Sequence, residues 1–141
     1  MANSSTSLRW VFRTQIDVRF RDCDAMGHVN HAVYLTYLEQ ARWHWWRQVV
    51  GAAPTPESSI ILARAECDYR APATFGELLE VRVAVTRVGR SSFECAYQIV
   101  RVADGRLIAH AKTVQVTYDY SKGLPVPIPE ALRNELERLQ S

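Results

Sequence analysis

The sequence contains few cysteines, little net charge and no long apolar run. Its three cysteines, Cys23, Cys67 and Cys95, are odd in number and form no CxxC pair, which argues against a disulfide framework. The net charge of +2 is too small for a general nucleic-acid binder. No stretch approaches the roughly 20 apolar residues of a membrane span, and the N-terminus lacks the apolar run of a signal peptide. We therefore expect a reduced, cytoplasmic protein that binds neither nucleic acid nor membrane.

The length of 141 residues fits one domain with a sizeable core. Hydrophobic residues make up 48% of the chain and charged residues 23%, which is ordinary for a globular protein and argues against disorder. Neither an internal repeat nor a low-complexity segment is present. Residues 1–8 are small and polar, so we expect a loose tail there and a single domain over residues 9–141.

One long helix is predicted over residues 31–50. Asn30 is a favourable N-cap residue, Gly51 is a plausible C-terminal stop, and Pro54 and Pro56 forbid continuation. Residues that share one helical face by their spacing are Tyr34, Tyr37, Leu38, Ala41 and Trp45.

The apolar arc of this helix is unusually wide. Leu35, Trp43 and Trp46 extend it beyond one stripe, which predicts a helix buried on most sides. A membrane-surface role for the tryptophans is an alternative, but Trp43, Trp45 and Trp46 spread around the helix rather than along one amphipathic face. Core packing or a helix–helix contact between subunits explains them better.

The rest of the chain reads as strands and a short terminal helix. An alternating pattern places Phe12, Ile16, Val18 and Phe20 on one side of a first strand. Four longer strands follow over residues 61–70, 79–86, 93–99 and 108–118, the last marked by Ile108, Val114, Val116 and Tyr118. Residues 129–140 have helical spacing in Leu132, Leu136 and Leu139.

Turn signals at residues 89–91 and 104–105 predict short hairpins, so the sheet should be antiparallel. We therefore expect an α+β fold in which about five antiparallel strands wrap around one long central helix, followed by a short C-terminal helix. Such a sheet has exposed edges, and a dimer that joins two sheets edge to edge would pair them.

Chemically reactive side chains gather just before the long helix. Unpaired N–H groups and the partial positive charge of a helix start suit a carbonyl oxygen that becomes an oxyanion, and a nearby carboxylate can act as nucleophile or as base for water. Acyl transfer or hydrolysis follows as a reaction class. The alternative is ordinary turn and cap chemistry, or packing in the case of the tyrosine. The cluster consists of Asp22, Asp24, Gly27, His28, Asn30, His31 and Tyr34.

The stretch FRDCDAMGHVNHAVYLTYLEQAR resembles the signature of hotdog-fold acyl-CoA thioesterases of the 4-hydroxybenzoyl-CoA thioesterase type. YRAPATFGELLEV and VGRSSFECAYQI are similar to later blocks of that family, and the resemblance covers roughly residues 12–120. It implies a hotdog fold, hydrolysis of an acyl-CoA or acyl-carrier-protein thioester, and a homodimer, which in many members pairs into a homotetramer. No cofactor and no metal are expected.

The resemblance also assigns roles to residues. Asp24 falls at the family's catalytic carboxylate, and His31 falls where a backbone N–H meets the thioester carbonyl. His31 and Tyr34 match a catalytic histidine and a tyrosine in one subgroup, and His28 matches a catalytic histidine in plant acyl-carrier-protein thioesterases. The latter have an asparagine where this chain has Met26, and GHVNN members have an asparagine at position 31.

Two further segments are implied to bind substrate. Gly27 and Asn30 belong to the GHVN stretch beside the thioester. Gly89, Arg90, Ser91 and Ser92 fall where the family has basic and hydroxyl residues that touch the CoA phosphates. A charged hairpin turn is the alternative interpretation of this second segment.

The expected reaction is thioester hydrolysis. Asp24 attacks the carbonyl directly or deprotonates a water, and either His28 or His31 orients that water. The thiolate, with a conjugate-acid pKa near ~8.5, leaves without strong acid help. One alternative is a metal-dependent hydrolase that uses Asp22, Asp24, His28 and His31 as ligands. Another is an acyl-CoA or acyl-carrier-protein binding module without catalysis.

Overall fold

The computed structural model describes residues 8–51 and 59–140, so the predicted tail over residues 1–8 lies almost wholly outside the described part, as do Pro54 and Pro56. Within it, no helix combines the length and the apolarity needed to cross a bilayer. The elements in chain order are β1 (Phe12–Asp17), the 3₁₀ turn η2 (Phe20–Asp22), α1 (His31–Trp45), the π-helical turn η3 (Trp46–Val50), β2 (Ser59–Tyr69), β3 (Leu78–Val88), β4 (Ser92–Arg101), β5 (Leu107–Asp119), β6 (Leu124–Pro125) and α2 (Glu130–Leu139).

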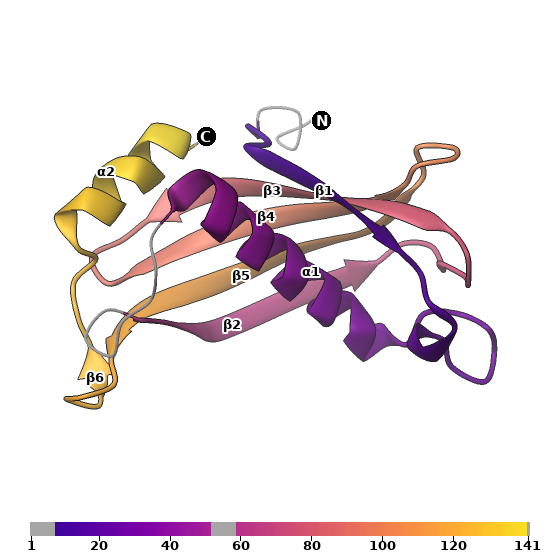
Figure 1. Cartoon of the computed structure of the whole chain (residues 1–141), viewed down its shortest axis with the longest axis horizontal. Helices are drawn as coiled ribbons and strands as arrows, with labels where there is room; N and C mark the ends of the chain where they lie inside the picture. Colours follow the sequence, from indigo (N-terminus) through magenta and orange to yellow (C-terminus); the bar gives the residue numbers. More distant parts are fainter. Residues whose placement is uncertain (1–7, 52–58, 141) are drawn as a thin grey trace.

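The strands form one antiparallel sheet in the order β1-β3-β4-β5-β2, with the short β6 paired to β5. The sheet curls around α1, which lies across its concave face, and α2 covers one end of the molecule (Figure 1). This is the hotdog fold, and the predicted α+β architecture is confirmed. β1 and β2 are the two edges of the sheet.

The helical stretch formed by α1 and η3 begins and ends where the sequence predicts, although its last five residues form a π-helical turn. Asn30 caps it by accepting the Ala32 N–H on its side-chain oxygen at 3.0 Å, and Gly51 ends η3 with a left-handed φ of 74°. The face predicted to be buried is buried, namely Tyr34, Tyr37, Leu38, Ala41 and Trp45. Its packing against the sheet supplies much of the core and fixes where the N-terminus of the helix lies.

The prediction that α1 is buried on most sides is wrong for the single chain. Leu35 and Trp43 are 40% and 48% exposed, whereas Trp46 is buried and stacks on Phe93 with ring centroids 5.9 Å apart. The sheet covers one side of the helix, and no described element of the same chain covers the side that carries Leu35 and Trp43.

One strand prediction also needs correction, whereas the strand marked by Ile108, Val114, Val116 and Tyr118 is present as β5. Phe20 does not share the buried face of β1, because the chain leaves the strand after Asp17 and turns into η2, so its ring is exposed. In β5, Val114, Val116 and Tyr118 are only half-buried, on the face opposite the core. A bulge beside Ile99 and Val100 shifts the register near the start of β5. Ile108, Ala109 and Ala111 of β5 belong to the core, and further along the strand the buried residues are polar, namely Thr113, Gln115, Thr117 and Asp119.

Candidate active site

The loop between η2 and α1 is a tight turn built around Asp24. Oδ1 of Asp24 accepts the Met26 N–H at 2.9 Å and the His28 N–H at 3.3 Å, and the Asp24 N–H donates to the His28 carbonyl at 2.8 Å. Gly27 closes the turn with a φ of +82°, a conformation that residues with a side chain rarely adopt. No described residue donates a hydrogen bond to Oδ2 of Asp24, and the side chain is exposed in the single chain. The turn thus fixes one carboxylate oxygen and leaves the other available.

Asp22, two residues earlier, has a structural role. The residue is 3% exposed, and its carboxylate accepts the Tyr37 hydroxyl at 2.7 Å, the Arg19 backbone N–H at 3.0 Å and the Arg19 guanidinium at 3.1 Å. Burial by itself would raise the pKa of Asp22, but these hydrogen bonds outweigh it and lower that pKa below its usual range. The Asp22 carbonyl also accepts the Asn30 N–H at 2.9 Å. Asp22 therefore ties the loop to α1.

The metal-ligand set considered from the sequence does not converge. Because the Asp22 carboxylate is hydrogen-bonded to Tyr37 and Arg19, it is not free to bind the same metal ion as Asp24. Among residues 8–51 and 59–140, no group of three or more His, Cys, Asp and Glu side chains is placed to hold a metal ion.

The first turn of α1 leaves one backbone donor open. The Ala32 N–H bonds to the Asn30 side chain, and the Val33 N–H bonds to the Asn30 carbonyl at 2.9 Å. No described residue accepts the N–H of His31, the first residue of the helix. This N–H lies at the positive end of the helix dipole and is a ready hydrogen-bond donor for an oxygen with developing negative charge.

Tyr69, which the sequence analysis did not single out, holds this helix start in place. Its hydroxyl donates to the His31 carbonyl at 2.9 Å, across 38 residues of sequence. The peptide between His31 and Ala32 is therefore bound on both sides, by Tyr69 at its C=O and by Asn30 at its N–H. Such bracing fixes the direction of the neighbouring free N–H, and no local sequence signal predicts it.

Tyr34 lies beneath the loop rather than at its surface. It is buried, and its hydroxyl oxygen accepts the Ala73 N–H at 3.2 Å. Its ring packs against Tyr69 and Tyr37 at centroid distances of 5.3 and 6.1 Å. Burial raises the pKa of Tyr34, so the phenol stays protonated. The side chains of His28 and His31, by contrast, are exposed.

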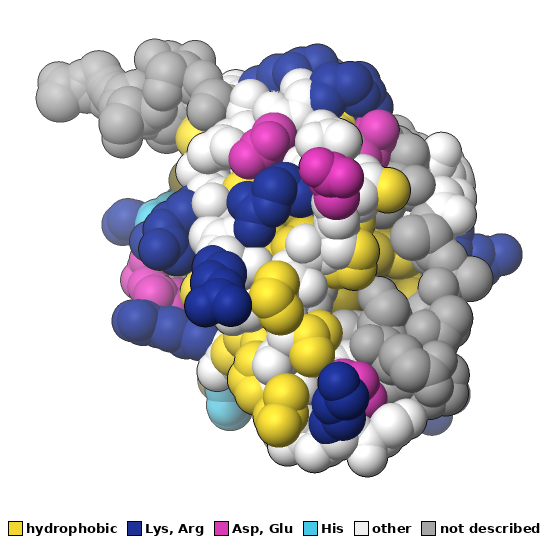
Figure 2. All heavy atoms as spheres, turned by 90° about the vertical axis from the view of Figure 1, so that its left-hand side faces the viewer, with side chains coloured by type: hydrophobic (Ala, Val, Ile, Leu, Met, Phe, Trp, Pro, Cys, Tyr) yellow, Lys and Arg dark blue, Asp and Glu magenta, His cyan; other side chains and the backbone are white. Residues whose placement is uncertain are grey.

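The segment Gly89–Ser92 lies at the other end of the sheet. His28 bridges to Thr74, just before β3, whereas Gly89 follows the end of β3, and 11 residues of strand span roughly 35 Å. Gly89 and Arg90 offer their carbonyls to the Arg133 guanidinium of α2 at 2.6 and 3.1 Å. Figure 2 views this end, where Lys and Arg side chains gather near a hydrophobic patch. One chain therefore does not bring residues 89–92 to Asp24.

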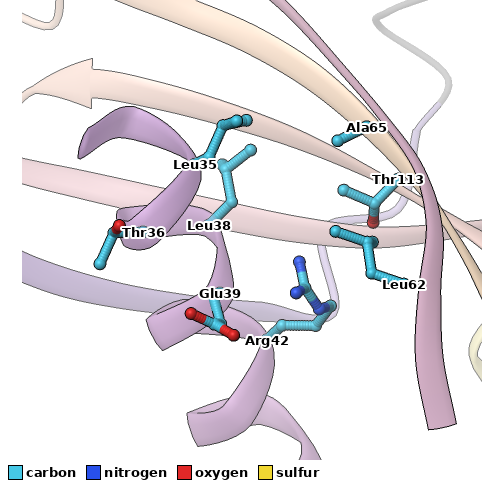
Figure 3. Close-up of a pocket in the computed structure, with 8 residues that line it drawn as sticks. All are labelled: Leu35, Thr36, Leu38, Glu39, Arg42, Leu62, Ala65 and Thr113. Atoms are coloured by element: carbon cyan, nitrogen blue, oxygen red, sulfur yellow. The ribbon is translucent and has the colours of Figure 1, made fainter. Parts of the chain in front are cut away.

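A cavity of about 160 Å³ lies between α1 and the β2 side of the sheet (Figure 3). It begins one helical turn after His31 and extends two turns further along α1. The sequence analysis missed it, because its walls come from three elements distant in the chain. Its lining consists of Leu35, Thr36, Leu38, Glu39 and Arg42 from α1, Leu62 and Ala65 from β2, and Thr113 from β5.

A family model described as the thioesterase-like superfamily matches residues 18–136, which include the loop, α1 and the sheet except β1. The chain belongs to the thioesterase-like superfamily. It is therefore an enzyme of the thioester hydrolase class, as the sequence predicts.

Similar proteins carry the same class of activity in their names. The chain is 27% identical to the acyl-CoA thioester hydrolase YbgC of Escherichia coli O6:H1 (91% of this chain, 97% of that protein). It is also 27% identical to the long-chain acyl-CoA thioesterase FadM of Escherichia coli K12 (90% and 98%). A thioesterase from Thermus thermophilus, crystallised with coenzyme A and Zn, is 32% identical and superposes with a TM-score of 0.78 (91% and 98%). These superfamily members span essentially the whole of this chain.

Proposed function

We propose that this protein hydrolyses acyl-CoA thioesters to the free acid and CoA, with Asp24 as the nucleophile or general base and the His31 N–H as the oxyanion donor. The observation that carries this proposal is the unbonded N–H of His31 at the start of α1, which follows by seven residues a carboxylate with one free oxygen in the loop that leads into the helix. The similarity to YbgC, FadM and the coenzyme A-bound Thermus protein supports acyl-CoA as the substrate.

The chemistry follows from those two groups. The thioester carbonyl oxygen hydrogen-bonds to the His31 N–H, whose donation and helix dipole stabilise the tetrahedral oxyanion. Oδ2 of Asp24 attacks the carbonyl carbon or removes a proton from the attacking water, while Oδ1 remains bound to the loop. The CoA thiolate leaves readily because its conjugate acid has a pKa near ~8.5. In the nucleophilic route this leaves a mixed anhydride of the acyl group and Asp24, and water then cleaves that anhydride to release the free acid and restore the carboxylate. Either His28 or His31, both exposed, orients the water.

Residues 89–92 contribute from a second copy of the chain. Within one chain they lie roughly 35 Å from the loop, which is too far for one ligand to bridge directly along β3. A homodimer joined at a sheet edge, such as β2, would pair the unpaired strand and cover the exposed Leu35 and Trp43. In that dimer the hairpin of one subunit binds the CoA phosphates, with Gly27 and Asn30 of the other beside the thioester.

Thiol release from a panel of acyl-CoA and acyl-carrier-protein thioesters tests the proposal. Purified wild-type protein should release thiol, with and without chelator, and Asp24→Asn should not keep that rate. Tight acyl-CoA binding without thiol release would replace the proposal with a binding module, and loss of activity on chelation would replace it with a metal-dependent hydrolase. Release from carrier-protein thioesters alone would replace acyl-CoA as the substrate.

A further inference from the structure

The cavity between α1 and the β2 side of the sheet contains a cation without a counter-ion. The guanidinium of Arg42 is half-buried and extends from α1 toward β2 and β5, where Leu62 and Thr113 lie (Figure 3). Its one hydrogen bond to a described residue goes from Nη1 to the Tyr97 hydroxyl at 3.3 Å. No carboxylate of the described residues lies within 4.0 Å, and Glu39, one turn earlier, is exposed and forms no ion pair with it.

The neighbouring acidic groups in the core do not supply the missing charge. Burial raises the pKa of Tyr97 far above its usual range, and it raises the pKa of the Cys95 thiol to about 12. Both groups therefore stay neutral at physiological pH. The Tyr97 hydroxyl is also paired with Thr113 Oγ1 at 2.6 Å, so it holds Arg42 in position without neutralising it. The guanidinium of Arg42 therefore keeps N–H donors without an anionic partner, and these donors match a carboxylate well.

The cavity lies where an acyl group bound at His31 would extend. Its lining residues follow His31 along α1 by one to three turns, and Arg42 lies about 16 Å further along the helix axis. Leu35, Leu38 and Leu62 provide an apolar path on the way, and Arg42 with Thr113 makes its far end polar.

We propose that the acyl group which this enzyme prefers ends in a carboxylate, which the guanidinium of Arg42 binds in the cavity between α1 and β2. The inference rests on the proposed acyl-CoA hydrolysis and names its substrate class: ω-carboxyacyl-CoA, the mono-CoA thioesters of medium-length dicarboxylic acids. Arg42 is thereby a specificity-determining residue, held in position by the Tyr97–Thr113 hydroxyl pair.

The test compares matched substrates that differ only at the far end of the chain. Hexanoyl-, octanoyl- and decanoyl-CoA are each paired with the ω-carboxy thioester of the same length: adipoyl-, suberoyl- and sebacoyl-CoA. For at least one length, kcat/KM of wild-type protein should favour the carboxylated member. Arg42→Met should lower this ratio by roughly ten- to a hundredfold, the value of a hydrogen bond to a charged group, while Arg42→Lys keeps part of it.

Two further variants sharpen the result. Glu39→Gln removes the like charge at the same cavity and should raise the ratio. Arg47→Met removes an exposed arginine of η3 outside the cavity and should leave the ratio unchanged. A preference for the uncarboxylated substrates at every length, or a ratio insensitive to Arg42→Met, would overturn the proposal.

A binding experiment separates this inference from the hydrolytic one. The thioether analogues S-octyl-CoA and S-carboxyheptyl-CoA carry no cleavable bond, and calorimetry with wild-type protein should show tighter binding of the second, lost in Arg42→Met. That result supports the inference even if no thioester is hydrolysed. The rival occupant is a carboxylate of a partner subunit: if Arg42→Met changes the oligomeric state by light scattering but not the relative affinity of the analogues, the guanidinium serves assembly and the inference is wrong.

Discussion

Replacement of Asp24 by asparagine isolates the charge of this side chain from its structural role. The asparagine keeps an oxygen that can accept the Met26 and His28 N–H groups, so the turn should persist. The side chain is exposed, and the free energy of unfolding should therefore change by no more than about 0.5 kcal/mol. The reactive oxygen, in contrast, is replaced by an amide nitrogen that is neither nucleophile nor base.

The expected loss is catalytic. Removing a principal acid–base group lowers the rate by at least roughly a hundredfold, which corresponds to about 2.7 kcal/mol of transition-state stabilisation. Steady-state thiol release with a good acyl-CoA substrate measures kcat, and urea denaturation of the same preparations measures stability.

The hairpin between β4 and β5 offers a matched control. Asp104 is also exposed and accepts the N–H of the residue two positions later, Arg106, at 3.1 Å. Asp104→Asn should leave kcat within about twofold of the wild-type value, because surface changes away from a site have small effects. Undiminished thiol release by Asp24→Asn, or an equal loss in Asp104→Asn, would refute the assignment of Asp24.

Four other substitutions test separate parts of the structure. Arg90→Met should raise KM for CoA substrates more than it lowers kcat, and an unchanged KM would leave Arg90 as a simple turn residue. Tyr37→Phe removes the hydroxyl bound to buried Asp22 and should cost about 1.5–3 kcal/mol in urea denaturation. Because the pKa of Asp22 is lowered by folding, its contribution is full near neutral pH and is lost as pH falls below about 4. The acid limb of the stability profile should be flatter in Asp22→Asn; an identical limb would contradict this. Asn30→Ala should cost about 1 kcal/mol through loss of the α1 cap, measured by thermal unfolding.

The parts of the fold that were predictable carry their signal locally. Asn30 and Gly51 marked the ends of the central helix, and alternation from Leu79 to Val85 marked β3, because period and capping are visible in neighbouring residues. The inward face of β5 was not predictable, since it depends on the pairing with β4, which places polar Thr113 and Gln115 opposite buried Cys95 and Phe93.

The candidate site was predictable only in part, because some of its contacts join segments that are distant in the sequence. The composition of residues 22–34 indicated carboxylate chemistry at a helix start, but not that Asp22 is buried on Tyr37 while Asp24 stays exposed. The contact from Tyr69 and the cavity at Arg42 depend on packing between distant segments. The exposure of Leu35 and Trp43 has no signature in the sequence, because the residue types of a helix face do not tell whether the sheet of the same chain covers it.

The hydroxyl of Tyr69 connects an edge strand of the sheet to the first peptide group of α1, because it donates to the His31 carbonyl. Tyr69 is the last residue of β2, which is one of the two edge strands of the sheet described in this chain. A strand of a neighbouring subunit that pairs with β2 would limit the motion of Tyr69. Tyr69 in turn limits the motion of the His31 carbonyl to which it donates. In such an assembly, strand pairing and the position of the helix start would depend on one phenol, so loss of the neighbour would also loosen the alignment at His31.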